Sequence, residues 1–209
     1  MGFIGRMKKI GIMVAGILLC TLLFGCSQKS TDEVTTITID KSGRILNTIV
    51  EDFEKEYYAE DELKSMIESD LSAYHKKYQN TQENLIKLES VNTSEQVATV
   101  KLIYPDAESY AQFNDVSFFS GTVSEAYQKG YSFEGVTLNS VKNDGTTLDK
   151  HAILSEGSLH VVITDEALKV RTYNDILYTS SNVTSINKKE ATIEADTESD
   201  NSLAYLLFK

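Results

Sequence analysis

The sequence predicts an α+β fold: a mainly antiparallel sheet with one long helix and two short helices, and a C-terminal half that is rich in strands. Apolar side chains recur at helical spacing over residues 60–78. Pairs of short segments with alternating apolar and polar side chains precede and follow that helix, as expected of hairpins. From residue 131 onward, short apolar runs between polar turns predict strands alone.

The N-terminus has the pattern of a bacterial export signal. Arg6, Lys8 and Lys9 give a positive start, and residues 10–24 carry no charge. That run is too short to span a bilayer, because a spanning helix needs about 20 apolar residues. Its length suits the apolar core of a signal peptide, and polar residues follow at once from residue 27.

The end of the apolar run, Leu23-Phe24-Gly25-Cys26, resembles the lipobox of bacterial lipoproteins. The resemblance implies cleavage after Gly25 and attachment of a diacylglycerol to the Cys26 sulfur, although Phe24 is bulkier than the residue usual at its position. Two acyl chains suffice for stable anchoring. We therefore expect an extracytoplasmic lipoprotein, anchored in the cell membrane at the outer face of the cytoplasmic membrane. The alternative is an uncleaved anchor helix with an incidental cysteine.

Length and charge limit what the exported part does. Removing the signal at residues 1–25 leaves 184 of 209 residues, with a tether at residues 26–33 and a domain at residues 34–209. Residues 34–130 and 131–209 are candidate subdomains. Seventeen basic and 31 acidic residues give the mature chain a net charge of −14. This charge argues against nucleic acid as a partner and leaves the lipid anchor as the contact with the membrane.

A hairpin and a helix open the predicted domain. Residues 34–39 and 45–53 predict the two strands of the hairpin, with Gly43 available for a positive φ in the turn. Residues 60–78 predict the long helix, with acidic residues at its start and basic residues at its end, as the helix dipole favours. Its apolar stripe consists of Leu63, Met66, Ile67, Leu71, Tyr74 and Tyr78.

A second hairpin is predicted from residues 85–91 and 96–104, with a loop at residues 92–95. Pro105 ends the second strand because proline has no N–H to donate to the ladder. In that strand one face should be apolar and the other polar. The apolar face consists of Ala98, Val100, Leu102 and Tyr104, and the opposite face includes Thr99 and Lys101.

Two short helices should follow. Residues 106–114 predict the first. Residues 122–129 predict the second, because Thr122 and Glu125 have the spacing of a capping box and Gly130 can end the helix.

The remaining chain predicts strands, with a loop over residues 145–153. A strand is expected at residues 131–141, and residues 159–164 and 168–173 predict a hairpin. Shorter strands are expected at residues 176–179, 183–186, 191–195 and 203–208. Since the last of these is apolar on both faces, it should be buried.

Three motifs carry a resemblance to a known family. They are YYAEDEL at residues 57–63, YPDAESYAQFN at residues 104–114 and FFSGTV at residues 118–123. Together with the lipobox they resemble a family of uncharacterised lipoproteins of clostridia and related Firmicutes, over most of the chain. That family has no assigned reaction, so the resemblance implies no catalytic residue. The C-terminal half is also similar to LppM-type lipoprotein domains of actinobacteria.

No motif for catalysis or metal binding is present in the sequence. It lacks a Gly-x-Ser-x-Gly nucleophile elbow and the glycine-rich loops that bind phosphate. His75, His151 and His160 are too far apart to suggest a zinc site. Cys20 leaves with the signal and Cys26 is acylated, so no thiol remains. We therefore expect no catalytic residue, no metal and no cofactor.

Acidic residues leave two further alternatives. A cluster near the C-terminus could bind Ca²⁺ loosely, but it lacks the glycine and spacing of an EF-hand loop, so a solvated turn is the expected structure. A carboxylate pair for glycoside cleavage stays open, although nothing in the sequence marks one pair. The cluster consists of Glu194, Asp196, Glu198, Asp200 and Asn201.

Aromatic residues are dense between residues 104 and 133, and two interpretations of them compete. The functional interpretation is a partly exposed groove for a peptide, glycan or lipid. The structural interpretation, which we favour, is packing of two short helices on the sheet. The candidate binding surface consists of Tyr104, Tyr110, Phe113, Phe118 and Phe119, with Tyr131 and Phe133 nearby.

The sequence thus favours a non-enzymatic binding or interaction module displayed at the cell surface by a lipid anchor. The protein, glycan or lipid that it binds is left open. One alternative is a carboxylate-dependent surface hydrolase acting on cell wall or glycan, which needs two carboxyls about 5–10 Å apart beside a groove. The other is a lipid- or amphiphile-binding domain, which needs an apolar cavity of about 300 Å³ or more.

Overall fold

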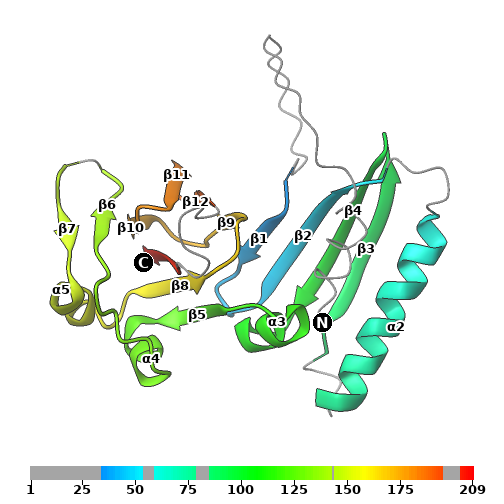
Figure 1. The fold of residues 1–209 in the computed structure, drawn as a ribbon, viewed down its shortest axis with the longest axis horizontal. Coiled ribbons are helices and arrows are strands. Elements are labelled where there is room, and N and C mark those ends of the chain that lie inside the picture. Colours follow the sequence, from blue (N-terminus) through cyan, green and yellow to red (C-terminus); the bar gives the residue numbers. More distant parts are fainter. Residues whose placement is uncertain (1–33, 54–58, 79–84, 143, 195–202) are drawn as a thin grey trace, which may run out of the picture.

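A computed structural model describes residues 34–53, 59–78, 85–142, 144–194 and 203–209. These residues form four helices and thirteen strands in two mostly antiparallel sheets, which confirms the predicted α+β fold (Figure 1). The export signal, the lipobox and the tether lie outside the described residues, so lipidation of Cys26 stays a prediction. No helix in the described ranges is long and apolar enough to cross a bilayer.

The larger sheet, sheet A, has the strand order β11-β12-β9-β1-β2-β4-β3. Its strands are β1 (Thr36–Ile39), β2 (Ile45–Asp52), β3 (Lys87–Ser94), β4 (Val97–Tyr104), β9 (Lys169–Arg171), β11 (Val183–Asn187) and β12 (Glu190–Ile193). Neighbours pair antiparallel, except that β1 and β9 run parallel. The first strand of the domain is thus flanked by a strand from its far C-terminal half.

The second sheet, sheet B, has the order β5-β8-β13-β10-β6-β7 and is antiparallel throughout. Its strands are β5 (Phe118–Thr122), β6 (Leu138–Ser140), β7 (Thr147–Leu148), β8 (His160–Thr164), β10 (Ile176–Thr179) and β13 (Ala204–Phe208). The two halves of the chain interleave, because β5 joins the later strands in sheet B while β9, β11 and β12 join the earlier strands in sheet A.

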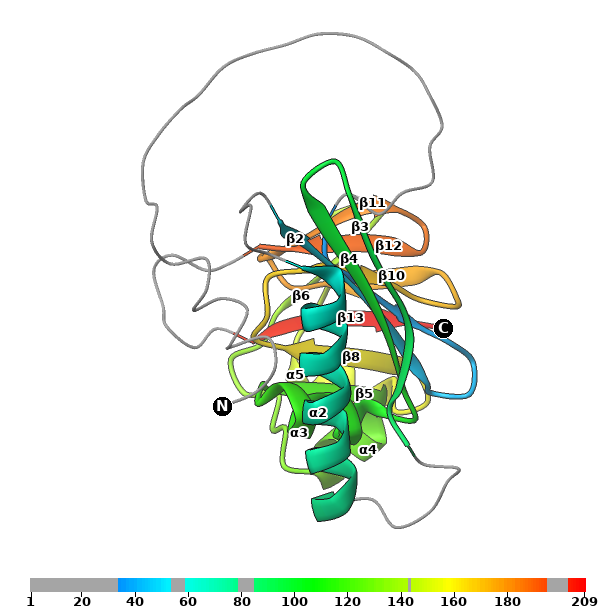
Figure 2. The ribbon, with the colours of Figure 1, turned by 90° about the vertical axis from the view of Figure 1, so that its right-hand side faces the viewer.

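The long helix α2 spans Glu60–Tyr78, as predicted. It lies over β3 and β4 at one end of sheet A (Figure 2). Most of its apolar stripe is buried, whereas Tyr78 is 43 % exposed. The buried positions are Leu63, Ile67, Leu71 and Tyr74.

The hairpin of β3 and β4 is confirmed, but its loop is shorter than predicted. Strand β3 continues to Ser94, and the turn consists of Glu95 and Gln96, both with positive φ. Two central residues with positive φ match the right-handed twist of a hairpin, so no longer loop is needed. The predicted apolar face of β4 is buried along its whole length.

The two predicted short helices are present, and each begins at a polar cap. Helix α3 (Ala107–Asn114) follows Asp106, whose side chain accepts a hydrogen bond from the backbone N–H of Ser109 at 2.7 Å. Helix α4 (Val123–Gln128) begins with the predicted capping box of Thr122 and Glu125.

The segment from residue 131 to residue 159 differs most from the prediction. The expected strand at residues 131–141 shrinks to β6, because Phe133 and Gly135 both adopt positive φ and interrupt an extended chain. The expected loop at residues 145–153 contains β7 and the start of helix α5 (Lys150–Ser155). Asp149 caps this helix by accepting from the N–H of Ala152 at 2.9 Å.

The predicted hairpin at residues 159–164 and 168–173 is wrong. Strand β8 belongs to sheet B and β9 to sheet A, so the short link between them is a crossover from one sheet to the other. Both strands find partners far away in sequence: β8 pairs with β5 and β13, and β9 pairs with β1 and β12. These long-range pairings replace the local one.

Sheet B is buried on both faces, so it separates the hydrophobic core into two clusters. Leu206 and Phe208 face the cluster shared with sheet A, α2 and α3, while Leu207 faces a second cluster under α4 and α5. The prediction that the last strand is buried is therefore confirmed. Of the predicted C-terminal acidic cluster, Glu194 is exposed and the rest lies outside the described residues.

Candidate functional site

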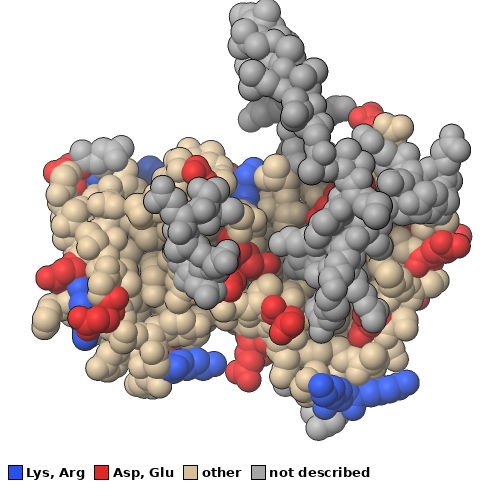
Figure 3. All heavy atoms as spheres, viewed as in Figure 1, with Lys and Arg blue, Asp and Glu red and all other residues tan. Residues whose placement is uncertain are grey.

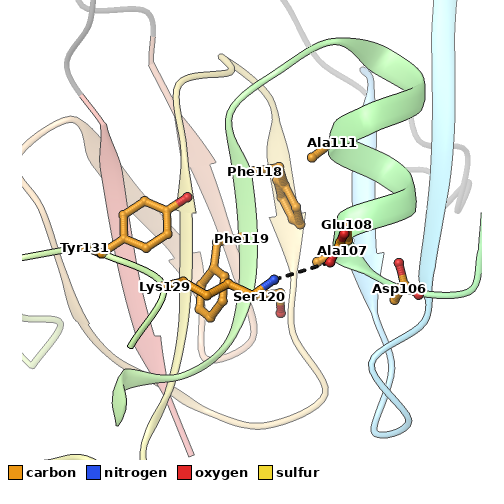
Figure 4. Close-up of a pocket in the computed structure, with 10 residues that line it drawn as sticks. Asp106, Ala107, Glu108, Ala111, Phe118, Phe119, Ser120, Lys129 and Tyr131 are labelled. Carbon is orange, nitrogen blue, oxygen red and sulfur yellow. Dashed lines mark hydrogen bonds and ion pairs between the residues drawn. The ribbon is translucent and has the colours of Figure 1, made fainter. Parts of the chain in front are cut away.

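A groove of about 540 Å³ lies beside β5, with α3 on one side and the end of α4 on the other (Figure 4). Figure 1 shows α3, β5 and α4 together at one edge of the fold. We call this the α3–β5 groove. It is lined by Asp106, Ala107, Glu108, Ala111, Phe118, Phe119, Ser120, Lys129, Gly130 and Tyr131.

The wall formed by α3 is positioned by the way that helix ends. Asp115 adopts the left-handed conformation, and its N–H donates to the carbonyl of Ala111. The next N–H, that of Val116, donates to the same carbonyl at 3.1 Å. The chain therefore turns sharply and enters β5 within a few residues, which places α3 directly against that strand.

The opposite wall depends on the capping box of α4. The backbone N–H of Thr122 donates to Glu125 Oε2 at 2.7 Å, and the N–H of Glu125 donates to Thr122 Oγ1 at 3.2 Å. Helix α4 thus starts at the last residue of β5. Gly130 then ends the helix with φ +101°, and the N–H of Tyr131 donates to Ala126 O at 3.1 Å. This tight ending brings the chain back to β5.

Gly121 allows the Phe119 ring to lie along the strand beside the groove. A Cβ on Gly121 would be 2.8 Å from Phe119 Cζ and 3.0 Å from Glu125 Oε2. Phe119 is 6 % exposed, and its ring centroid is 5.4 Å from that of Tyr131. The ammonium of Lys129 lies 6.0 Å from the centre of the Phe119 ring. Glycine is needed here for close approach of a side chain.

An ion pair crosses the groove from one wall to the other. Lys129 Nζ lies 3.4 Å from Glu108 Oε2, and the two side chains are 57 % and 78 % exposed (Figure 4). Exposed pairs of this kind contribute about 0–1 kcal/mol to stability. The contact is therefore weak enough for a ligand to replace it.

The bottom of the groove is an unpaired strand edge. Residues 117 and 123 bond to β8 through Asp165 N–H to Ser117 O and Val123 N–H to Leu159 O. Antiparallel ladders alternate, so Phe119 and Gly121 also face β8, whereas the N–H and C=O of Phe118 and Ser120 point outward. No other described residue bonds to these four backbone groups. We call them the free edge of β5.

Carboxylates follow the free edge of β5 along its length. Asp106 and Glu108 belong to the groove wall, and Glu125 is bonded to Thr122 at the end of the free edge. Next to the groove, toward the C-terminal end of α3, a second hollow of about 480 Å³ is lined by Glu108, Asp115 and Asp165. Figure 3 shows acidic side chains scattered over the face seen in Figure 1.

The structure corrects most of the predicted aromatic binding surface. Tyr104 and Tyr110 are fully buried and Phe113 is 6 % exposed, so these three belong to the core. The rings of Tyr110 and Phe113 meet the Tyr104 ring edge to face, with centroids 5.0 and 6.0 Å from its centroid. Burial raises the pKa of both tyrosines above the usual range, which leaves them protonated. Phe118 and Phe119 are also 6 % exposed and belong to the core, although they line the α3–β5 groove.

Sequence reasoning missed the polar part of this groove. Glu108, Ser120 and Lys129 come from three different elements, and nothing in their spacing links them. The signal that could have pointed to them is Gly121 next to Phe119, since a glycine inside a strand often marks a close approach.

Several described carboxyls are hydrogen-bonded in ways that lower their pKa. Glycosidase acids need a pKa raised toward neutrality. Five described carboxyls have a pKa that is shifted the other way, downward. The backbone N–H of Thr122 is the main cause for Glu125, and the Lys150 ammonium is the main cause for Glu134. The others are Asp40, Asp144 and Glu190.

The three histidines lie in separate places. His75 is half-buried on α2, His151 is exposed on α5, and the His160 ring lies 5.6 Å from that of Tyr173 and 5.4 Å from that of Phe208. Within the described ranges, no three His, Cys, Asp or Glu side chains are grouped as metal ligands would be.

Comparison with known proteins gives one partial likeness. A family model described as patatin phospholipase matches residues 51–146, a little under half of the chain. The matched segment includes α3 and β5 and hence most of the groove. It has no Gly-x-Ser-x-Gly: its nearest approach, Gly130-Tyr131-Ser132, is followed by glycine one position too late and lies in an irregular segment before β6.

Neither the curated proteins nor the solved structures contain a match to this chain. The chain is therefore similar to a patatin-phospholipase model over one segment.

Proposed function

We propose that this protein is a membrane-anchored extracytoplasmic lipoprotein, of the clostridial type that its motifs resemble, and that its domain is a non-enzymatic binding module. The observation that carries the proposal is the α3–β5 groove, in which an unpaired strand edge and an exposed ion pair lie beside the largely buried rings of Phe118 and Phe119. Such a mixture of apolar surface and polar groups is typical of binding sites.

The position of the groove suits a domain tethered at its N-terminus. Thr35 lies beside Val50, with its hydroxyl accepting from the N–H of Val50 at 3.2 Å. At the other end of the same strand, Ile45 pairs with Tyr104, just before α3. The two ends are separated by about 17 Å at the usual rise of a strand. The groove therefore lies at the end away from the point where the tether would enter (Figure 1).

A second candidate is a lipid- or amphiphile-binding domain. The patatin-phospholipase likeness of residues 51–146 favours it, together with the Phe119 and Tyr131 rings beside a charged pair. An amphiphile would place its chain on the rings and its head group on Lys129 or Glu108. In this candidate the protein binds the amphiphile without hydrolysing it, because the matched segment has no nucleophile elbow.

Hydrogen-exchange mass spectrometry of the full chain in lipid nanodiscs tests both candidates. Three probes are added in turn: soluble peptidoglycan fragments, short basic peptides and micelles of a short-chain phospholipid. At least one should slow exchange in residues 106–111 and 118–131 and leave residues 183–193, at the far edge of sheet A, unchanged. If no probe protects the groove segments, the binding function is wrong. Recovery of a cleaved probe would instead support the hydrolase alternative.

A further inference from the structure

We propose that the α3–β5 groove binds an extended basic peptide, which adds a strand to sheet B along the free edge of β5. This inference rests on the proposed binding function and names the class of partner. An added strand gains affinity from backbone hydrogen bonds and specificity from side chains that alternate between the two walls.

The backbone geometry fits a peptide strand. The free edge of β5 presents two N–H and two C=O groups, on Phe118 and Ser120, and these are spaced as one side of an antiparallel ladder requires. The flanking residues limit the length of the pairing. Of the next outward residues on either side, Val116 donates its N–H to Ala111 O and Thr122 donates its N–H to Glu125. An incoming strand thus pairs with two residues of β5 and makes four hydrogen bonds.

Two other described edges, those of β3 and β7, are blunted in the ways that natural sheets use. On β3, Glu60 Oε2 accepts from the N–H of Thr93 at 2.9 Å, and a register shift bends the strand. At the far end of sheet B, β7 has two residues, Thr147 and Leu148. The free edge of β5 differs because it lies at the bottom of a groove, where α3 and the end of α4 can hold a peptide on both sides.

The charge of the groove determines the chemistry of the peptide. Asp106 and Glu108 line the groove and Glu125 is bonded to Thr122 at the end of the free edge, whereas Lys129 is the basic residue that lines the groove. Lys129 is already paired with Glu108. A peptide with Lys or Arg at alternate positions would meet carboxylates on the α3 side, whereas an acidic peptide would meet like charges.

The Lys129–Glu108 ion pair occupies the place that a basic side chain of the peptide would take. It crosses the groove at the level of Ser120 (Figure 4). Because both side chains are mostly exposed, separating them costs little, and Glu108 gains the peptide's cation in exchange. Lys129 is therefore a competitor for the site, and removing its charge should strengthen peptide binding.

The first measurement is a titration by fluorescence anisotropy. The full chain in nanodiscs is titrated with a labelled peptide of about eight residues that alternates Lys and Val, a length typical of a strand. A Glu–Val peptide of the same length is the charge control. The basic peptide should bind at least about tenfold more tightly, since two or more carboxylates lie beside it.

Amide exchange resolved to single residues is the second measurement. The basic peptide should slow exchange of the Phe118 and Ser120 amides. The Phe119 and Gly121 amides are already bonded to β8 and serve as internal controls. Methylating the peptide nitrogens that face β5 should weaken binding about tenfold, whereas methylating the alternate nitrogens should not.

Three variants of the chain complete the test. Ser120→Pro removes an outward N–H without breaking the ladder to β8, and it should weaken binding about tenfold. Glu108→Gln should weaken peptide binding and Lys129→Gln should tighten it. Glu89→Gln, at an exposed site on β3 in the other sheet, should leave peptide binding unchanged. If Ser120→Pro does not fold, the methylated peptides test the same contact.

Equal binding of the acidic and basic peptides, or unchanged exchange at Phe118 and Ser120, would overturn the proposal. Weaker binding of the basic peptide to the Lys129→Gln variant would also overturn the proposal, because Lys129 would then help to bind the peptide. If the basic peptide fails while a glycan or phospholipid protects the groove, this inference falls and the proposed binding function stands. If no probe protects the groove, both fall.

Discussion

Replacing Gly121 by alanine tests how β5 is held beside the groove. The new Cβ would be 2.8 Å from Phe119 Cζ and 3.0 Å from Glu125 Oε2, and real contacts are not that short. Phe119 is 6 % exposed and packed in the core under α4, so its ring has little room to move. Overpacking of this kind costs about 1–3 kcal/mol.

Loss of the capping box adds to that cost. Glu125 Oε2 accepts from both the N–H and the hydroxyl of Thr122, at 2.7 and 2.8 Å, and a displaced carboxylate would lose these bonds. Caps contribute about 0.5–2 kcal/mol. Since Glu125 is on the surface and can adjust, we expect Gly121→Ala to lower the unfolding free energy by about 2 kcal/mol. For a chain of this size the Tm should fall by about 4–8 °C.

Urea unfolding followed by far-UV circular dichroism measures this change, since the chain has no tryptophan to report by fluorescence. Ser120→Ala is the matched control, and it should change the unfolding free energy by less than about 0.5 kcal/mol. Phe119→Leu should relieve the clash, so the double variant with Gly121→Ala should lose at least about 0.5 kcal/mol less than the sum of the single variants. Additive losses, or a wild-type midpoint for Gly121→Ala, would refute the reasoning.

Three further changes have defined outcomes. Tyr110→Phe removes a buried hydroxyl that donates to Glu166 Oε2 at 2.8 Å. Urea unfolding should show that the unfolding free energy falls by about 1.5 kcal/mol. An unchanged unfolding free energy would contradict this hydrogen bond. Thr122 donors lower the pKa of Glu125 below its usual 4.5. Its contribution to stability is therefore complete above pH 4.5 and is lost as the pH falls through the lowered value, so the difference between wild type and Glu125→Gln should shrink in acid melts. Cys26→Ala should abolish metabolic labelling with palmitate and release the chain from membranes. If the Cys26→Ala variant is still labelled with palmitate, the lipid anchor in the proposed function is wrong.

Local signals predicted the elements that depend on neighbours in sequence. The periodicity and end charges of α2 gave its bounds, and the spacing of Thr122 and Glu125 gave the start of α4. Pro105 marked the end of β4 because proline cannot continue a ladder. In each case the stabilising contact lies within a few residues of the signal.

Pairings between distant segments could not be predicted in the same way. Strand β5 was missed because its partner β8 follows about forty residues later, and the strand-like residues around Asp165 suggested a hairpin that the sheets do not form. The same limit applies to the site. The aromatic density correctly favoured a core, whereas the meeting of Glu108 with Lys129 depends on how α3 and α4 end on either side of β5.

The place of β13 has a consequence for how the chain is made. This strand comes last in the sequence, yet it lies between β8 and β10 and supplies side chains to both clusters of the core. A chain synthesised from its N-terminus therefore contains both neighbours of β13 before β13 itself, so the pairing that joins β8 to β10 through β13 forms late.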